Sequence, residues 1–195
     1  MERKRKWNTY KIKILKKAKK ASGFLKWISR ANPFIKTLTL QKIWFGLGRS
    51  RLEYGAELFN TKDKWQEAET LQNKVMRFIL KLKGNTNLTF MQGELNWLTL
   101  KGRRDMLRLR YWRKIISMKK NRLTKIAYSE EIKKERKISW AKQTKKILKM
   151  YGLEKYWKNQ LPPIRESNWN KIVESSIKKK EEQSWNLERK KKMQN

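Results

Sequence analysis

A run of basic residues between Leu100 and Met118 has the side-chain types that bind phosphate. The planar guanidinium of arginine donates two parallel hydrogen bonds to a phosphate group, and much of the rest of the chain uses lysine instead. This segment is therefore the predicted nucleic-acid contact surface, with a solvated charged face as the alternative reading. The predicted contact residues are Lys101, Arg103, Arg104, Arg108, Arg110, Arg113 and Lys114.

Helical winding separates these cations from the apolar residues of the same segment. At about 100° per residue, the basic side chains form two stripes that lie between two apolar sides. Arg103, Arg110 and Lys114 form one stripe, and Lys101, Arg104 and Arg108 form the other. A helix with two apolar sides is held by neighbours on both, so we expect its cations to occupy fixed positions.

Trp97 precedes this helix, at the junction with another predicted helix. An indole ring there could stack on a nucleic-acid base. Packing within the helix junction is the alternative, and it is favoured because large aromatic side chains usually fill cores.

Residue types that most enzymes need are missing or isolated. The chain has no Cys and no His, which excludes disulfides, thiolate nucleophiles, Ser-His catalysis and Cys/His zinc sites. Its only aspartates are Asp63, in a capping-box spacing with Gln66, and Asp105, placed for a local ion pair among arginines. No glycine-rich phosphate loop is present. We therefore expect no catalytic residue, no bound metal, no cofactor and no small-molecule substrate.

The overall charge favours a polyanionic partner. Fifty-two Lys and Arg against seventeen Asp and Glu give a formal net charge of +35, which RNA or DNA would neutralise. Ten Trp, six Tyr and six Phe argue against a disordered chain. No apolar run could span a bilayer and no signal peptide is evident, so we expect an intracellular protein, in the nucleus or cytoplasm.

The periodicity of apolar residues predicts an all-α protein, an irregular array of roughly seven helices with a basic surface and frayed termini. Asn32-Pro33 is a predicted helix start, and Gly84 a predicted helix stop. Pro162-Pro163 is a predicted linker, and the final helix loses its apolar stripe and is expected to fray beyond Lys178. The remaining predicted helices cover 7–30, a stretch ending near 60, one from 63 toward 84, 86–94, 99–118, 123–134 and 139–150, with a turn at 154–157.

Three stretches resemble the region that follows the polymerase palm in non-LTR (LINE-type) retrotransposon reverse transcriptases. Leu52 to Phe59 is similar to a family pattern Leu-x-Tyr-Gly-x-Glu-x-Trp, with Phe59 in place of the Trp. Leu71 to Leu80 resembles Leu-Gln-x-Lys-x-x-Arg-x-Ile-Leu. Gly93 to Trp112 resembles Gly-Glu-Leu-x-Trp…Arg-Arg-Asp…Leu-Arg-Tyr-Trp.

The resemblance covers roughly residues 20–128 and implies a helical thumb and post-thumb region that holds template and primer. We expect the chain to divide into a thumb-like segment at 1–60, a basic helical unit at 61–128 and a helical tail at 129–195. No Tyr/Phe-x-Asp-Asp sequence occurs, so the polymerase active site is absent and the chain is expected not to be an enzyme. The remainder of a retroelement polymerase is a possible partner.

Sequence-tolerant binding of RNA, or of an RNA–DNA hybrid, is thus the predicted function. Two other classes stay open at this stage. One is a structural RNA-binding protein of a ribonucleoprotein particle. The other is an interfacial membrane binder, because basic amphipathic helices with Trp are common there; the apolar stripes of successive helices look mutually satisfying, so a membrane partner ranks last.

Overall fold

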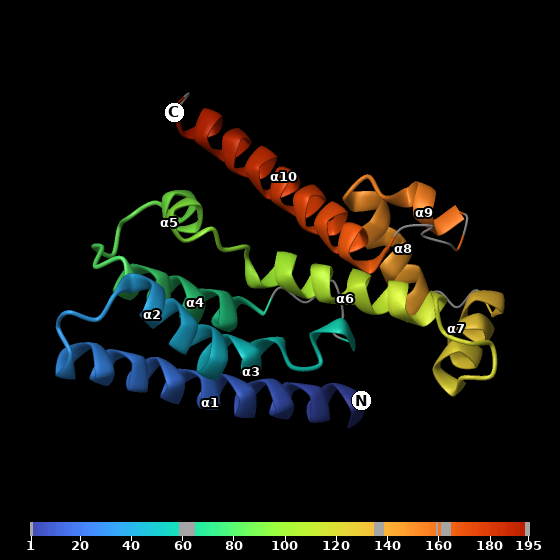
Figure 1. Cartoon of the computed structure of the whole chain (residues 1–195), viewed down its shortest axis with the longest axis horizontal. Helices are drawn as coiled ribbons and strands as arrows, with labels where there is room; N and C mark the ends of the chain where they lie inside the picture. The colour runs from blue at the N-terminus through green and yellow to red at the C-terminus, as the bar shows by residue number, and fades with distance from the viewer. Residues whose placement is uncertain (1, 59–64, 135–138, 159, 161–164, 194–195) are drawn as a thin grey trace. The chain divides into compact units, whose positions relative to one another are not determined.

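A computed structural model describes residues 2–58, 65–134, 139–158, 160 and 165–193. Within these residues the secondary structure is helical and no strand occurs, which confirms the all-α prediction. The chain forms two compact units: unit 1 comprises Met1–Tyr54 and Trp65–Leu100, and unit 2 comprises Gly55–Lys64 and Lys101–Asn195. Figure 1 shows the helices of both units along the chain.

Unit 1 is built on its longest helix, α1 (Glu2–Ala31), which contacts α2, the turn η1, α3 and α4. Helix α4 also contacts α5. The elements of unit 1 after α1 are α2 (Thr37–Trp44), the π-helical turn η1 (Phe45–Arg49), α3 (Ser50–Glu53), α4 (Gln66–Ile79) and α5 (Leu88–Leu95).

The core of unit 1 forms because apolar residues recur at helical spacing on facing helices. Small residues of α1, Ala18 and Ala21, are buried together with larger side chains of the other helices. Its fully or nearly fully buried members include Ala18, Ala21, Leu25, Leu40, Trp44, Leu52, Val75, Met76, Ile79, Met91 and Leu95.

Two glycines near the turn η1, Gly48 and Gly55, have structural reasons. A Cβ atom at Gly48 would overlap the Trp44 ring, so only glycine allows the indole to pack against the backbone here. Gly55 adopts φ +68° after α3, a left-handed conformation that favours glycine.

Unit 2 is organised around α6 (Leu100–Ile116), whose first residue belongs to unit 1. Its Trp112 ring lies against those of Trp157 and Trp169, with ring centroids 6.0 and 5.7 Å apart. A Cβ atom at Gly102 would meet the Glu181 carboxylate and lie 3.1 Å from Ile177 Cγ2, so the side chains of α10 pack closely on α6 at this glycine. The other elements of unit 2 are η2 (Ala56–Leu58), α7 (Leu123–Lys133), α8 (Trp140–Met150), α9 (Glu154–Lys158) and α10 (Glu166–Met193).

Several predicted helix boundaries differ from the structure. The second helix begins at Thr37 rather than at Asn32-Pro33, and its N-cap residue, Lys36, makes no side-chain capping bond. Helix α4 ends at Ile79, before Gly84, because Lys81 takes the left-handed conformation (φ 53°). Asp63 and the Pro162-Pro163 linker lie outside the described residues.

Helix α10 continues to Met193 without a break at Lys178, although its apolar stripe ends there. The helical segments outnumber the expected seven, because the stretch expected as one helix up to residue 60 is divided by η1 and by the turn before η2. The two units also cut across the expected division at 60 and 128, since both are assembled from separate parts of the chain.

Candidate nucleic-acid interface

The predicted contact helix, α6, hides two of its arginines. Arg104 and Arg108 are 6% and 2% exposed, so neither side chain is presented to a partner. Arg108 Nε donates to Thr144 Oγ1 at 3.1 Å, and its guanidinium lies 5.0 Å from the centre of the Trp140 ring. Burial lowers the pKa of Arg108 to about 10, against the opposing charges of Asp105 and Glu131, so the group stays protonated at neutral pH. Its place among α8 side chains is structural, which corrects the prediction for these two residues.

The remaining cations of α6 are largely engaged by unit 2 itself. Lys101 Nζ lies 2.7 Å from Asp105 Oδ2, as expected of a local ion pair, although the partner is lysine rather than an arginine. Tyr151 Oη also donates to that carboxylate, at 2.8 Å. Arg110 and Arg113 lie 3.8 and 3.7 Å from glutamates of α10, Glu174 and Glu166.

Arg103 is half-buried, with Nη1 3.4 Å from the Met106 sulfur. Lys114 is exposed. The stripe of Arg103, Arg110 and Lys114 is therefore accessible in part, whereas the stripe of Lys101, Arg104 and Arg108 is mostly covered.

Trp97 does not present its ring to solvent. It is 3% exposed, its Nε1 donates to Gln41 Oε1 at 3.1 Å, and its ring is tilted against Phe45 at 5.0 Å. Base stacking on Trp97 is contradicted by this burial, and the helix-junction alternative is confirmed.

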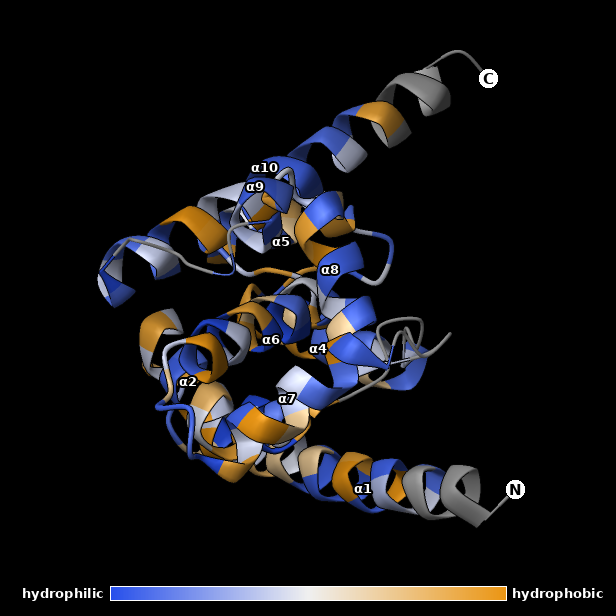
Figure 2. Cartoon of the chain, turned by 90° about the vertical axis from the view of Figure 1, so that its right-hand side faces the viewer, coloured by the Kyte–Doolittle hydropathy of each residue, from blue (hydrophilic) through white to orange (hydrophobic). Residues whose placement is uncertain are grey.

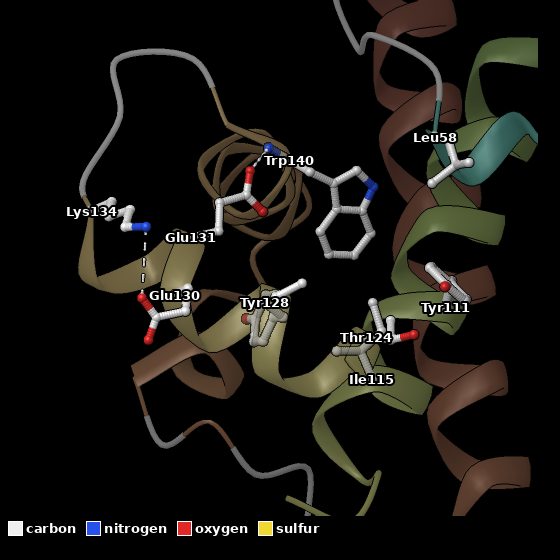
Figure 3. A pocket seen from close by; sticks show the side chains of 10 residues that line it. Leu58, Tyr111, Ile115, Thr124, Tyr128, Glu130, Glu131, Lys134 and Trp140 are labelled. Carbon is white, nitrogen blue, oxygen red and sulfur yellow. Dashed lines mark hydrogen bonds and ion pairs between the residues drawn. The ribbon is translucent and has the colours of Figure 1, made fainter. Parts of the chain in front are cut away.

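One cavity of unit 2, of about 390 Å³, is lined mainly by aromatic, apolar and acidic side chains, and its lysine, Lys134, lies 3.8 Å from Glu130 (Figure 3). Its walls include the aromatic rings of Tyr111, Tyr128 and Trp140, and the carboxylates of Glu130 and Glu131. Glu131 Oε1 accepts a hydrogen bond from the Trp140 backbone N–H at 2.6 Å and so holds the start of α8. Carboxylates at this position would repel a polyanion, so this cavity is not part of a nucleic-acid surface.

A second basic surface, which the sequence reasoning did not select, lies on α1. No acidic residue occurs between Glu2 and Glu53, so the solvent side of α1 carries cations without intervening carboxylates. Among the described residues, no ion pair to these side chains is present. This α1 basic face consists of the exposed residues Lys13, Lys16, Lys17, Lys19, Lys20, Lys26 and Arg30.

The α1 basic face is fixed by the opposite side of the same helix. Ala18, Ala21 and Leu25 are buried against the rest of unit 1, which leaves the cations on the outer half of the helix circumference. Figure 2 shows polar and apolar residues alternating along α1 as it turns. Phe24 and Trp27, stacked with ring centroids 5.8 Å apart, stand among the cations and are partly exposed.

The sequence indicates this surface by its lack of acidic residues between Glu2 and Glu53, and not by a high density of arginine. Unit 1 carries 20 Lys and Arg and 5 Asp and Glu, counted over 1–54 and 65–100, which leaves 32 (52 − 20) and 12 (17 − 5) for unit 2. The acids of unit 2 pair with the α6 cations, whereas the α1 cations have no acids near them in the sequence.

Comparison of the chain with family models, curated proteins and solved structures finds no match. Over the described residues, no group of three or more acidic side chains is placed to hold a metal ion. None of the described helices combines the length and the apolar character needed to cross a membrane.

Proposed function

We propose that the chain binds RNA or DNA through the phosphate backbone with little sequence preference, and that the α1 basic face is the main contact surface. The observation that carries this proposal is the set of exposed lysines on one side of α1 with no carboxylate between Glu2 and Glu53. Phosphate contacts release counterions, so such a surface binds any strand and binds it more weakly as salt rises.

The spacing of the lysines suits a linear polyanion. Lys13, Lys16 and Lys20 lie within about 60° of one another on the helix, and Lys13 and Lys20 are separated by roughly 10 Å along its axis. A strand running along α1 could therefore meet several ammonium groups in succession. Lysine stems are flexible, which favours sequence-tolerant contact over base readout.

The test is a set of three triple variants with equal loss of charge. The first replaces Lys16, Lys19 and Lys20 by Gln, which keeps length and helix propensity. The second replaces Arg103, Arg110 and Lys114 on α6. The matched control replaces the exposed residues Lys142, Lys145 and Lys149 on α8.

Affinity for a labelled oligonucleotide is measured by fluorescence anisotropy over a range of salt concentrations. The α1 triple is expected to weaken binding most and to reduce the salt slope by about 0.7–0.9 for each phosphate group that the variant no longer neutralises. The α6 triple should have a smaller effect, because its arginines already contact glutamates of α10. Equal effects of all three triples, or a salt-independent affinity, would refute the assignment to α1.

The exposed aromatic residues of unit 1 favour a second candidate, binding at a membrane surface. Phe34 is 94% exposed and Trp27 is 63% exposed, close in sequence to lysines. The main apolar side of α1 is buried in unit 1, however, and the exposed apolar residues Ile12, Phe24 and Trp27 stand among lysines rather than on a continuous apolar face. Flotation with vesicles rich in anionic lipid, in the absence of nucleic acid, separates the two candidates.

We also infer, from the motif resemblance, that the chain corresponds to the thumb and post-thumb region of a LINE-type reverse transcriptase. The absence of a Tyr/Phe-x-Asp-Asp sequence supports a binding role without catalysis. The pure chain is then expected not to extend a primed template with Mg²⁺ or Mn²⁺. Template-dependent extension that co-purifies with the chain through successive columns would contradict this inference.

A further inference from the structure

Unit 1 contains a cavity where α1 meets α3, at the edge of the α1 basic face. Its volume is about 510 Å³, within the range of roughly 300–1,000 Å³ that is usual for small-molecule sites. The polar side chains that line it are Tyr10, Lys13, Lys17, Ser50, Arg51 and Tyr54.

The walls of the cavity are held by two hydrogen bonds between its sides and by one within the α3 side. Arg51 Nη1 donates to the Lys17 carbonyl oxygen at 3.1 Å, and Tyr10 Oη donates to the Tyr54 carbonyl oxygen at 3.2 Å. Ser50 Oγ donates to the Gly46 carbonyl oxygen at 2.5 Å. These bonds fix the backbone and side chains of α1 and α3 around the cavity without using a carboxylate.

The chemistry of the lining matches one class of ligand. Lys13, Lys17 and Arg51 supply three positive charges, and no acidic side chain lines the cavity. The two other cavities described in unit 2 are both lined by Glu131. Arg51 has further guanidinium donors beyond the one that contacts Lys17, and these suit phosphate oxygens.

Tyr54 adds a surface for a base. Its side chain is 72% exposed at the edge of the cavity, although an aromatic ring of this size is usually buried. Base–aromatic stacking tolerates any base, because every base has a π-face. A phosphate site beside an exposed phenol ring is thus arranged for one nucleotide.

We infer that this cavity binds a single nucleotide unit, with its phosphate on Lys13, Lys17 and Arg51 and its base against Tyr54. The inference rests on the proposed function, since the nucleotide belongs to the strand that the α1 basic face holds. A free mononucleotide has the same chemistry, and the experiment separates the two sources.

The experiment uses the full chain and three probes: a ten-nucleotide thymidine oligomer, an abasic oligomer of the same length, and AMP. The variants are Tyr54→Leu, Arg51→Gln and Lys13→Gln. Lys13 makes no internal hydrogen bond or ion pair among the described residues, so Lys13→Gln removes charge without disturbing the fold. Circular dichroism checks that Arg51→Gln, which loses the bond to Lys17, remains folded.

Tyr54→Leu is expected to weaken binding of the thymidine oligomer by about 5- to 150-fold, with an unchanged salt slope. The same variant should leave binding of the abasic oligomer unchanged, because no base is present to stack. Arg51→Gln and Lys13→Gln should weaken both oligomers and lower the salt slope by about one each. AMP binding that is lost in Arg51→Gln would support the same site with a free nucleotide as its ligand.

The binding measurements distinguish failure of the nucleotide site in the cavity from failure of nucleic-acid binding by the α1 basic face. If Tyr54→Leu, Arg51→Gln and Lys13→Gln all bind the thymidine oligomer as the unaltered chain does, the cavity is not a nucleotide site. The α1 triple variant would still weaken binding in that case, and the proposed function would stand. If the unaltered chain binds no oligomer at low salt, the proposed function and this inference both fail.

Discussion

Replacing Tyr128 by Phe tests the contribution of two linked hydrogen bonds inside unit 2, from Trp112 to Tyr128 and from Tyr128 to Gln160. Trp112 is 0% exposed, and its Nε1 donates to Tyr128 Oη at 2.8 Å. Tyr128 Oη in turn donates to Gln160 Oε1 at 3.2 Å. Tyr128→Phe removes one oxygen atom and leaves a buried indole N–H without an acceptor. Gln160 is half-buried, so water can replace its lost partner.

The expected loss of stability comes from the buried Trp112 N–H, which has no acceptor in Tyr128→Phe. An unsatisfied buried N–H costs about 1–3 kcal/mol, which corresponds to a roughly 5- to 150-fold rise in the population of the opened state. Hydrogen exchange of the α6 and α7 amides measures that population within unit 2. Tyr111→Phe is the matched control, because no hydrogen bond of the Tyr111 hydroxyl occurs among the described residues, and it should change stability by less than about 0.5 kcal/mol.

The effect of Tyr128→Phe on the free energy of unfolding is also expected to depend on pH. Burial raises the pKa of Tyr128 to about 12, while hydrogen bonds to Trp112 and Gln160 act in the opposite direction. A phenol whose pKa is raised by folding stabilises the fold below its unfolded pKa of about 10, and this contribution is lost as pH rises from about 10 to 12. The stability difference between the unaltered chain and Tyr128→Phe should therefore shrink at alkaline pH, by up to about 2–3 kcal/mol.

Lysine deprotonation changes the stability of the unaltered protein and of Tyr128→Phe equally, so it cancels in the difference between them. The reasoning is refuted if Tyr128→Phe is as stable as Tyr111→Phe at neutral pH. It is also refuted if the stability difference between the unaltered chain and Tyr128→Phe stays constant up to about pH 12.

Three further changes have expected results. Gly48→Ala should destabilise unit 1 by about 1–3 kcal/mol in urea unfolding, because a Cβ atom would overlap the Trp44 ring, whereas Gly46→Ala, where nothing lies within 4 Å of a Cβ, should not. Ser139→Ala should cost about 0.5–2 kcal/mol, measured by exchange of the α8 amides, because the serine hydroxyl caps that helix; unchanged exchange would exclude the cap. Tyr151 has a pKa raised by burial and by Asp105, so Tyr151→Phe should retain more stability than the unaltered chain above about pH 10 in alkaline unfolding, and identical profiles would contradict this.

Local signals predicted several helices because those signals act through the backbone of the same segment. The apolar periodicity predicts a helix at 139–150, and in the structure Ser139 Oγ caps α8 by accepting from the Lys142 backbone N–H at 3.0 Å. Gly152, just after α8, has φ +71°, a left-handed conformation that favours glycine at a helix end. Helix α4 was less well predicted, since Trp65 and Lys81 adopt left-handed conformations that their residue types do not favour.

The candidate site was harder to predict, because the exposure of a cation depends on what packs over it. The alternation of apolar and basic residues on α6 was visible in the sequence. The sequence did not reveal that α8 would cover Arg108 or that α10 glutamates would approach Arg110 and Arg113. The cavity at Arg51 and Tyr54 joins these residues to positions of α1 more than thirty residues earlier, so no local pattern indicates it.

The interleaved division of the chain has a consequence for its synthesis. Because 55–64 belongs to unit 2 while the flanking segments belong to unit 1, the chain passes between the units three times. The Trp140 indole donates to the Glu57 carbonyl oxygen across 83 positions, so this bond between α8 and η2 forms only after α8 has left the ribosome. Unit 1, by contrast, is complete in sequence once Leu100 has been added. The nascent chain can thus order unit 1 first, with the segment around η2 held out as a loop until its partner helix arrives.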